Sequence, residues 1–189
     1  MTFATWLTVL RMLLVIPLAG AIYHGIFGWA LVVFVTASIT DFLDGLIARR
    51  FNQESLLGKA LDPIADKLLV ATALVSLISI GQIYGWLIFG SLLIILRETF
   101  VAGLREFLGP YQITVPVSFL GKTKTTAQLV AIATILGASW LTEPSWLIIA
   151  GENLLWLAVI LTLISGAQYT IVGSKALRVL EKPSTDEDS

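Results

Sequence analysis

Long apolar runs separated by short polar connections make up most of this chain. A helix that crosses a hydrocarbon core of about 30 Å needs about 20 predominantly apolar residues. Six runs reach that length, at residues 6–23, 27–50, 59–81, 84–107, 120–141 and 146–173. The pattern predicts an all-α integral membrane protein with six transmembrane helices in a domain at residues 1–175. The remainder, residues 176–189, is expected to be a polar C-terminal tail that is disordered at its end.

Composition supports a membrane protein over a soluble one. Of the 189 residues, 57% are hydrophobic and 13% are charged, whereas about 25% of the residues of soluble domains are charged. The chain has no cysteine, which excludes a disulfide framework and thiolate chemistry. The first apolar run is too long for a secretory h-region and follows no basic segment, so we expect it to be a retained span.

Charged and aromatic residues predict the orientation of the spans. All twelve Lys and Arg residues fall on one side of a six-span arrangement, and the connections near residues 24, 82 and 144 contain none. By the positive-inside rule, both termini and the second and fourth connections are cytoplasmic. Tryptophans gather at the opposite ends of the spans, as expected for anchors at headgroup level: Trp29, Trp86, Trp140 and Trp146.

Four aspartates interrupt two of the apolar runs. Asp41 and Asp44 are three residues apart, and Asp62 and Asp66 are four apart, so each pair projects from one face of a helix. Carboxylates inside a membrane are rare unless they serve an ion pathway, a proton relay or a ligand. An all-carboxylate site favours a hard cation, Mg²⁺ or Mn²⁺. Four such groups about one helical turn apart can hold two ions that clamp a phosphoryl group.

Small residues accompany the acids. Gly45 and Ala48 follow Asp44, and Gly58 precedes the second pair, so the helix surface beside the acids is open to a phosphate group. Small residues in membrane helices also serve helix packing. Their position beside the acids favours the ligand-binding interpretation.

The combined pattern D-x2-D-G-x2-A-R-x8-G-x3-D-x3-D resembles the signature of the CDP-alcohol phosphotransferase family. The matching positions are Asp41, Asp44, Gly45, Ala48, Arg49, Gly58, Asp62 and Asp66. The resemblance implies a six-helix enzyme in which an acceptor hydroxyl attacks the β-phosphorus of a CDP-linked alcohol and CMP leaves. It further implies that the four aspartates bind metal and that Asp66 is also the general base. The donor CDP group would be bordered by Asp41, Gly45, Ala48, Arg49 and Gly58.

A second polar cluster lies at the same predicted end of spans four and five, and it is basic. Its cations are Arg97, Arg105, Lys122 and Lys124. Cations beside an acidic metal site indicate an anionic ligand, because Arg binds phosphate through a planar fork and Lys as a point charge. Taken singly, Arg105 and Lys124 are equally well explained as ordinary cytoplasmic loop charges. Arg97 lies deeper in an apolar run and is harder to explain in that way.

The basic segments resemble one branch of the same family. Residues 97–128 contain the motifs R-E, L-R-E and G-K-x-K-T-x-x-Q. These motifs resemble those of the branch that transfers a phosphatidyl group from CDP-diacylglycerol to sn-glycerol 3-phosphate. The stretch T-W-L-T-V-L-R at residues 5–11 is also similar and adds Thr8 and Arg11 as candidate donor contacts. It departs from that branch at Ala4 and Thr5, where a proline and an asparagine are expected.

The resemblance also carries expectations about location and partners. It suggests a homodimer in the inner (cytoplasmic) membrane of the cell, in contact with membrane lipid, with the active site facing the cytoplasm. No nucleic-acid partner is expected. Other acceptors remain open on the same chemistry, namely inositol phosphate, serine or phosphatidylglycerol.

Two interpretations from other classes compete with the enzyme. Intramembrane carboxylates also occur in divalent-cation transporters, but spans one, three and five show few polar groups outside their cytoplasmic third. The four aspartates are alternatively a structural ion-pair network with no catalytic role.

Overall fold

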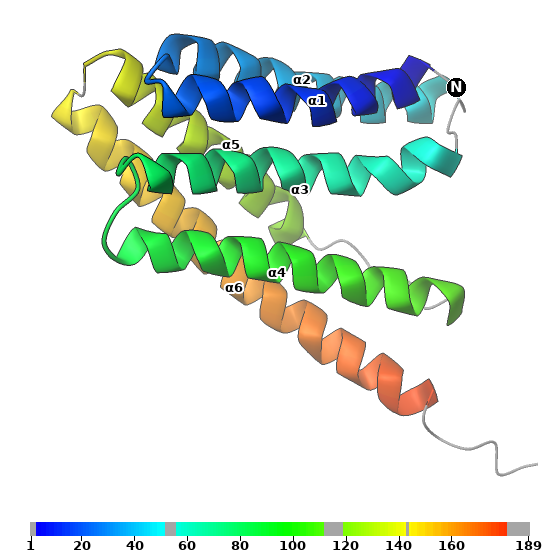
Figure 1. The fold of residues 1–189 in the computed structure, drawn as a ribbon. Coiled ribbons are helices and arrows are strands. Elements are labelled where there is room, and N and C mark those ends of the chain that lie inside the picture. The colour runs from blue at the N-terminus through cyan, green and yellow to red at the C-terminus, as the bar shows by residue number, and fades with distance from the viewer. Residues whose placement is uncertain (1–2, 52–55, 112–118, 143, 181–189) are drawn as a thin grey trace, which may run out of the picture.

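The computed structural model describes residues 3–51, 56–111, 119–142 and 144–180. Side chains are described within these ranges except at residues 3–5, 42–51, 56, 57, 59, 60, 119, 120, 122 and 175–180. Over these ranges the chain is all helical (Figure 1). The helices are α1 (Phe3–Tyr23), α2 (Phe27–Phe51), α3 (Leu56–Ser79), α4 (Trp86–Leu108), the 3-10 turn η1 (Gly109–Tyr111), α5 (Phe119–Trp140) and α6 (Ser145–Leu180).

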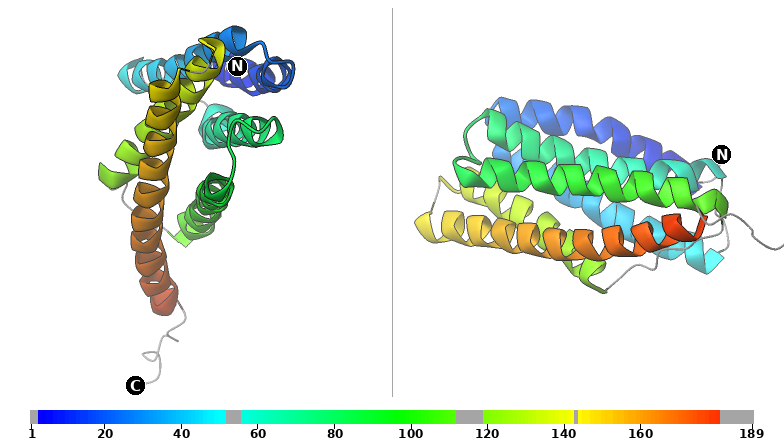
Figure 2. Two further views of the ribbon diagram at one scale, coloured as in Figure 1. Left: turned by 90° about the vertical axis from the view of Figure 1, so that its left-hand side faces the viewer. Right: turned by 90° about the horizontal axis from the view of Figure 1, so that it is seen from below.

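Consecutive helices run in opposite directions and close into a ring. Contacts join α1 to α3, α3 to α4, α4 to α6, α6 to α5, α5 to α2 and α2 back to α1. Figure 2 shows α6 running obliquely along one side of the bundle, where it contacts α5 and α4. Because the direction alternates, the beginnings of α1, α3 and α5 lie at the same end of the bundle as the ends of α2, α4 and α6. We call this end of the bundle the polar end.

Large apolar side chains fill the interior and also cover the outside. Leu18, Phe34, Leu74, Ile132 and Leu155 are at most 1% exposed and form part of one continuous core. Many residues of the same kind point outward, including the tryptophans at the end opposite the polar end. A soluble monomer rarely exposes so much contiguous apolar surface. The outside of the ring is therefore suited to lipid.

The sequence prediction of six helices is confirmed, whereas the six membrane spans are confirmed only in part. Among the described residues, three helical stretches are long and apolar enough to cross a membrane, Trp6–Tyr23, Trp86–Tyr111 and Ser145–Ser174. Phe27–Asp41 is a shorter apolar helical stretch. Charged residues occupy the early turns of α3 and α5, which lowers the hydropathy of these two helices.

The connections on either side of α4 lie close to the ends of the predicted spans. Residues 81–85 form the turn that joins α3 to α4, and they contain Gly81 and Gly85, whose φ angles of 78° and 57° favour glycine. At the other end, α4 ends at Leu108, and residues 112–118 lie outside the described ranges. Helix α6 continues to Leu180, five residues beyond residue 175, the predicted end of the membrane domain.

Glycines allow close packing of α6 on its neighbours. A Cβ atom added at Gly151 would lie 2.8 Å from Cγ1 of Ile135 on α5, and one at Gly166 would lie 3.0 Å from Cγ of Arg97 on α4. Small residues of this kind let membrane helices approach one another. At Gly166 this approach brings the backbone of α6 against the stem of Arg97.

Candidate functional site

The predicted acids and cations lie at the polar end of the bundle. Asp41 is in the second half of α2, while Asp62 and Asp66 are in the first half of α3. Arg97 is at the midpoint of α4, Arg105 is in the last turn of α4, and Lys124 is in the second turn of α5. Because the helix direction alternates, charged side chains that are more than 80 residues apart in the sequence lie at the same end of the bundle.

Helix α1 contacts three of the acids. Thr8 Oγ1 donates a hydrogen bond of 2.6 Å to Asp62 Oδ1. Arg11 forms an ion pair with Asp41, and its Nη1 lies 4.0 Å from Asp66 Oδ1. Thr8 and Arg11 are three residues apart and share one helix face. A single turn of α1 thus connects carboxylates from two other helices, and we call these five residues the acid cluster.

Burial is distributed unevenly within the acid cluster. The side chain of Arg11 is 1% exposed, whereas those of Asp41 and Asp66 are 34% and 51% exposed. A buried guanidinium requires a charged or hydrogen-bonding partner, and Asp41 supplies one. The carboxyl groups of Asp41 and Asp66 are close to each other, because both lie within 4.0 Å of Nη1 of Arg11. Two carboxylates at that separation repel unless a proton or a cation lies between them.

The donor set of the acid cluster fits a hard divalent cation, because the carboxylate groups of Asp41 and Asp66 are 34% and 51% exposed and supply oxygen ligands. Within the described ranges, no three acid, histidine or cysteine side chains are close enough together to form a metal site. The predicted ligand Asp44 and the predicted donor contacts Gly45, Ala48 and Arg49 lie on α2 where side chains are outside the described set. Gly58, also predicted to border the donor, is buried near the start of α3.

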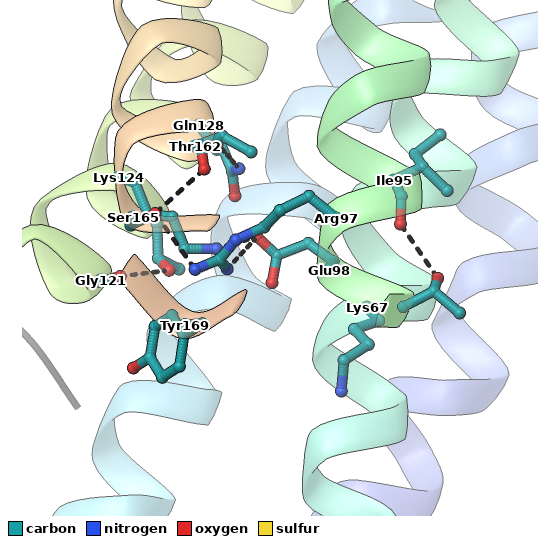
Figure 3. A network of polar contacts seen from close by, with 12 residues as sticks. Lys67, Ile95, Arg97, Glu98, Gly121, Lys124, Gln128, Thr162, Ser165 and Tyr169 are labelled. Atoms are coloured by element: carbon teal, nitrogen blue, oxygen red, sulfur yellow. Dashed lines mark hydrogen bonds and ion pairs between the residues drawn. The ribbon is translucent and has the colours of Figure 1, made fainter. Parts of the chain in front are cut away.

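Across the bundle, a second group of side chains joins α4 to α5 and α6 (Figure 3). Glu98 forms an ion pair with Lys124, and Oε1 of Glu98 lies 3.4 Å from Nη1 of Arg97. Arg97 Nη2 donates a hydrogen bond of 3.1 Å to Ser165 Oγ on α6. Lys124 is 3% exposed, so the lysine charge is held inside the bundle by Glu98. The side chain of Lys122 lies outside the described set.

Tyr169, one helical turn after Ser165, contacts two arginines of α4. Arg105 Nη2 donates a hydrogen bond of 2.5 Å to Tyr169 Oη, and the Arg105 guanidinium carbon lies 4.8 Å from the ring centre. The guanidinium carbon of Arg97 lies 5.2 Å from the same centre. Both distances are within the range of a cation–π interaction. The structure thus brings together Arg97, Arg105 and Lys124, which with Glu98, Ser165 and Tyr169 we call the cation cluster.

Sequence reasoning did not assign roles to several residues of these clusters. Glu98, Ser165 and Tyr169 were not candidates, nor was the buried pair in which Gln128 Nε2 donates 3.1 Å to Thr162 Oγ1. A usable signal exists on α6, because Thr162, Ser165 and Tyr169 recur at helical spacing on one face of an otherwise apolar run.

Sequence comparison identifies the class of protein. The profile of the CDP-alcohol phosphatidyltransferase family matches residues 1–164, and the chain belongs to that family. Those residues cover α1 to α5 and more than half of α6. The chain is therefore a phosphatidyltransferase, and its apolar helices make it a membrane protein.

Individual relatives have a more specific name. The CDP-diacylglycerol–glycerol-3-phosphate 3-phosphatidyltransferase of Rickettsia bellii is 45% identical over 137 residues, which are 72% of this chain and 74% of the relative. The protein of the same name from Salmonella choleraesuis is 40% identical over 172 residues, which are 87% of this chain and 91% of the relative. The chain resembles both along most of their length.

Proposed function

We propose that this protein transfers a phosphatidyl group from CDP-diacylglycerol to sn-glycerol 3-phosphate, giving phosphatidylglycerophosphate and CMP, with Mg²⁺ or Mn²⁺ as cofactor. The observation that carries the proposal is the presence of an acid cluster and a cation cluster at the same end of one bundle. The first suits a metal-bound pyrophosphate and the second a phosphate-bearing acceptor. The names of the relatives support the same donor and acceptor.

The acid cluster binds and activates the reacting groups. Asp41, Asp44, Asp62 and Asp66 are the residues that would hold divalent metal, and the metal would neutralise charge on the pyrophosphate of the donor. Thr8 and Arg11 fix the positions of Asp62 and Asp41 through their hydrogen bonds. The more exposed Asp66 accepts the proton of the acceptor hydroxyl as its oxygen attacks the β-phosphorus. The bond from that phosphorus to the bridging oxygen breaks, and CMP leaves with the electron pair.

The charge of the cation cluster selects the acceptor class. Its three cations and one carboxylate leave a net charge of +2 among the described side chains. A phosphate monoester near neutral pH carries a charge of about −1.5 to −2, whereas serine has no net charge. Arg97 Nε is buried and has no hydrogen-bond partner among the described residues, so it retains a donor for a phosphate oxygen. These features favour glycerol 3-phosphate or another phosphorylated acceptor over serine.

The two clusters also account for how both substrates reach the site. The polar end is the cytoplasmic end by the distribution of Lys and Arg, so water-soluble glycerol 3-phosphate arrives there directly. The acyl chains of the donor stay in the bilayer beside the apolar outside of the ring. The protein would accordingly lie in the inner membrane with the reaction at the cytoplasmic surface.

The proposal is tested by measuring CMP release from CDP-diacylglycerol by the purified protein in mixed micelles. Glycerol 3-phosphate, inositol phosphate, serine and phosphatidylglycerol are supplied in parallel with Mg²⁺ or Mn²⁺, and an EDTA arm serves as the metal control. We expect CMP release that requires metal and is fastest with glycerol 3-phosphate. Absence of CMP with every divalent metal, or faster release with serine, would contradict the proposal.

Two variants test the roles proposed for the acid cluster and the cation cluster. Asp66→Asn removes the general base and is expected to lower kcat by about 100-fold or more, while full activity would favour a structural ion-pair network. Arg97→Gln is expected to raise KM for glycerol 3-phosphate more than KM for the donor, because its guanidinium belongs to the cation cluster. The matched control is Arg178→Gln, which removes the same charge near the end of α6.

A further inference from the structure

Tyr169 is the contact that two arginines of the cation cluster share. Its side chain is 4% exposed, and both guanidinium groups lie about 5 Å from the centre of its ring. Arg97 and Arg105 are eight residues apart on α4 and carry like charges, so they repel each other. A ring face with negative partial charge attracts each of them. The ring therefore offsets the cost of keeping the two cations close together.

The hydroxyl of Tyr169 acts mainly on the more exposed arginine. Arg97 has a second anchor at Ser165 and a third contact at Glu98. Arg105 is anchored by its hydrogen bond to Tyr169 Oη. Removing that hydroxyl releases Arg105 in particular, and removing the ring releases both arginines.

We propose that Tyr169 is a positioning residue that holds Arg97 and Arg105 as a paired seat for one phosphate group, and that it thereby sets the affinity of the site for a phosphorylated acceptor. This inference rests on the proposed function for the identity of the acceptor. Tyr169 acts through the arginines and takes no part in the bond-making step, since its hydroxyl oxygen accepts a hydrogen bond from Arg105 and its ring contacts both guanidinium groups. Its loss should change acceptor binding while leaving turnover at saturation nearly intact.

The kinetic test compares Tyr169→Phe, which keeps the ring, with Tyr169→Leu, which removes it. We expect KM for glycerol 3-phosphate to rise about threefold to fivefold for Tyr169→Phe and about tenfold or more for Tyr169→Leu. KM for CDP-diacylglycerol and kcat should stay within about twofold, because the acid cluster is untouched. Tyr23→Phe, at the opposite end of the bundle, is the matched control and should leave all three constants unchanged.

A double-mutant cycle separates positioning from general packing. If the hydroxyl works through Arg105, then Tyr169→Phe has no further effect on KM in an Arg105→Gln background. If Tyr169→Phe instead raises KM by the same factor in the parent and in the Arg105→Gln background, the role of the hydroxyl is overturned. Unchanged acceptor KM in both Tyr169→Phe and Tyr169→Leu would overturn the inference altogether. If Tyr169→Leu fails to fold, the comparison of Tyr169→Phe in the two backgrounds still decides the result.

A binding measurement distinguishes failure of this inference from failure of the proposed function. Inorganic phosphate is titrated into the protein in EDTA by isothermal titration calorimetry, so neither turnover nor metal contributes. Weaker phosphate binding by both Tyr169 variants supports the paired seat even if glycerol 3-phosphate gives no CMP. Equal phosphate binding by the parent protein and both variants overturns the paired seat even if the synthase activity is confirmed.

Discussion

Replacing Arg11 by methionine should destabilise the protein when metal is absent. Methionine keeps most of the volume and removes the charge that lies between Asp41 and Asp66. Removing one partner of a fully buried ion pair costs about 3–5 kcal/mol. Water reaches the two carboxylates here, since their side chains are 34% and 51% exposed. Solvent screening reduces the expected loss to about 1–3 kcal/mol.

Divalent metal should reverse part of this loss. A cation bound between the carboxylates replaces the charge that Arg11 supplied, and it no longer competes with the guanidinium for Asp41. If Arg11→Met binds Mn²⁺ about tenfold more tightly, saturating metal stabilises the variant by about 1.4 kcal/mol more than the parent. For a chain of this size, each kcal/mol corresponds to about 2–4 °C in the midpoint of thermal unfolding.

The assay is thermal unfolding in detergent followed by tryptophan fluorescence, in EDTA and over a Mn²⁺ series. Arg105→Met is the matched control, because Arg105 is an arginine of the same end of the bundle that contacts a tyrosine. Its response to metal should equal that of the parent. An Arg11→Met variant with parental stability in EDTA and a parental response to Mn²⁺ would refute this account of the acid cluster.

Two further predictions test single contacts. Thr8→Val removes the 2.6 Å hydrogen bond that orients Asp62, and the metal concentration for half-maximal CMP release should rise severalfold; an unchanged metal requirement would separate Thr8 from the metal site. Gly151→Ala places a methyl group 2.8 Å from Cγ1 of Ile135 and within 3.4 Å of its backbone nitrogen, so the protein should lose about 1–2 kcal/mol of stability in thermal unfolding. Gly103→Ala, with nothing within 4 Å of the added atom, should be neutral or slightly stabilising, and equal behaviour of the two glycine variants would contradict the close packing of α5 on α6.

The hydrophobic pattern was sufficient to predict six helices and their approximate ends. An apolar run of about 20 residues bounded by polar or glycine-rich connections has few alternatives in a membrane chain. The alternating direction of the helices places the aspartates of α2 and α3 at the same end of the bundle, where Arg11 contacts Asp41 and Asp66 and Thr8 contacts Asp62. The position of α1 between them was not predicted.

The rotation of each helix about its axis could not be predicted from the pattern. In a soluble bundle the polar face of a helix indicates which side is outward. Here both the core side and the lipid side are apolar, as Leu155 at 0% exposure and its neighbour Trp156 at 40% illustrate. The pairings of Tyr169 with Arg105 and of Lys124 with Glu98 depend on that rotation. They therefore required the three-dimensional structure.

The acid cluster and the cation cluster belong to one electrostatic region, and Lys67 is the residue that connects them. It follows Asp66 on α3, the helix that adjoins α4 in the ring. Lys67 interacts electrostatically with Asp66 on one side and with Arg105 and Lys124 on the other. Its ammonium group donates to the carbonyl oxygen of Pro63 on its own helix, so the side chain lies along α3. Under the proposed function, a donor at the acid cluster and an acceptor phosphate at the cation cluster would both be within the electrostatic influence of Lys67.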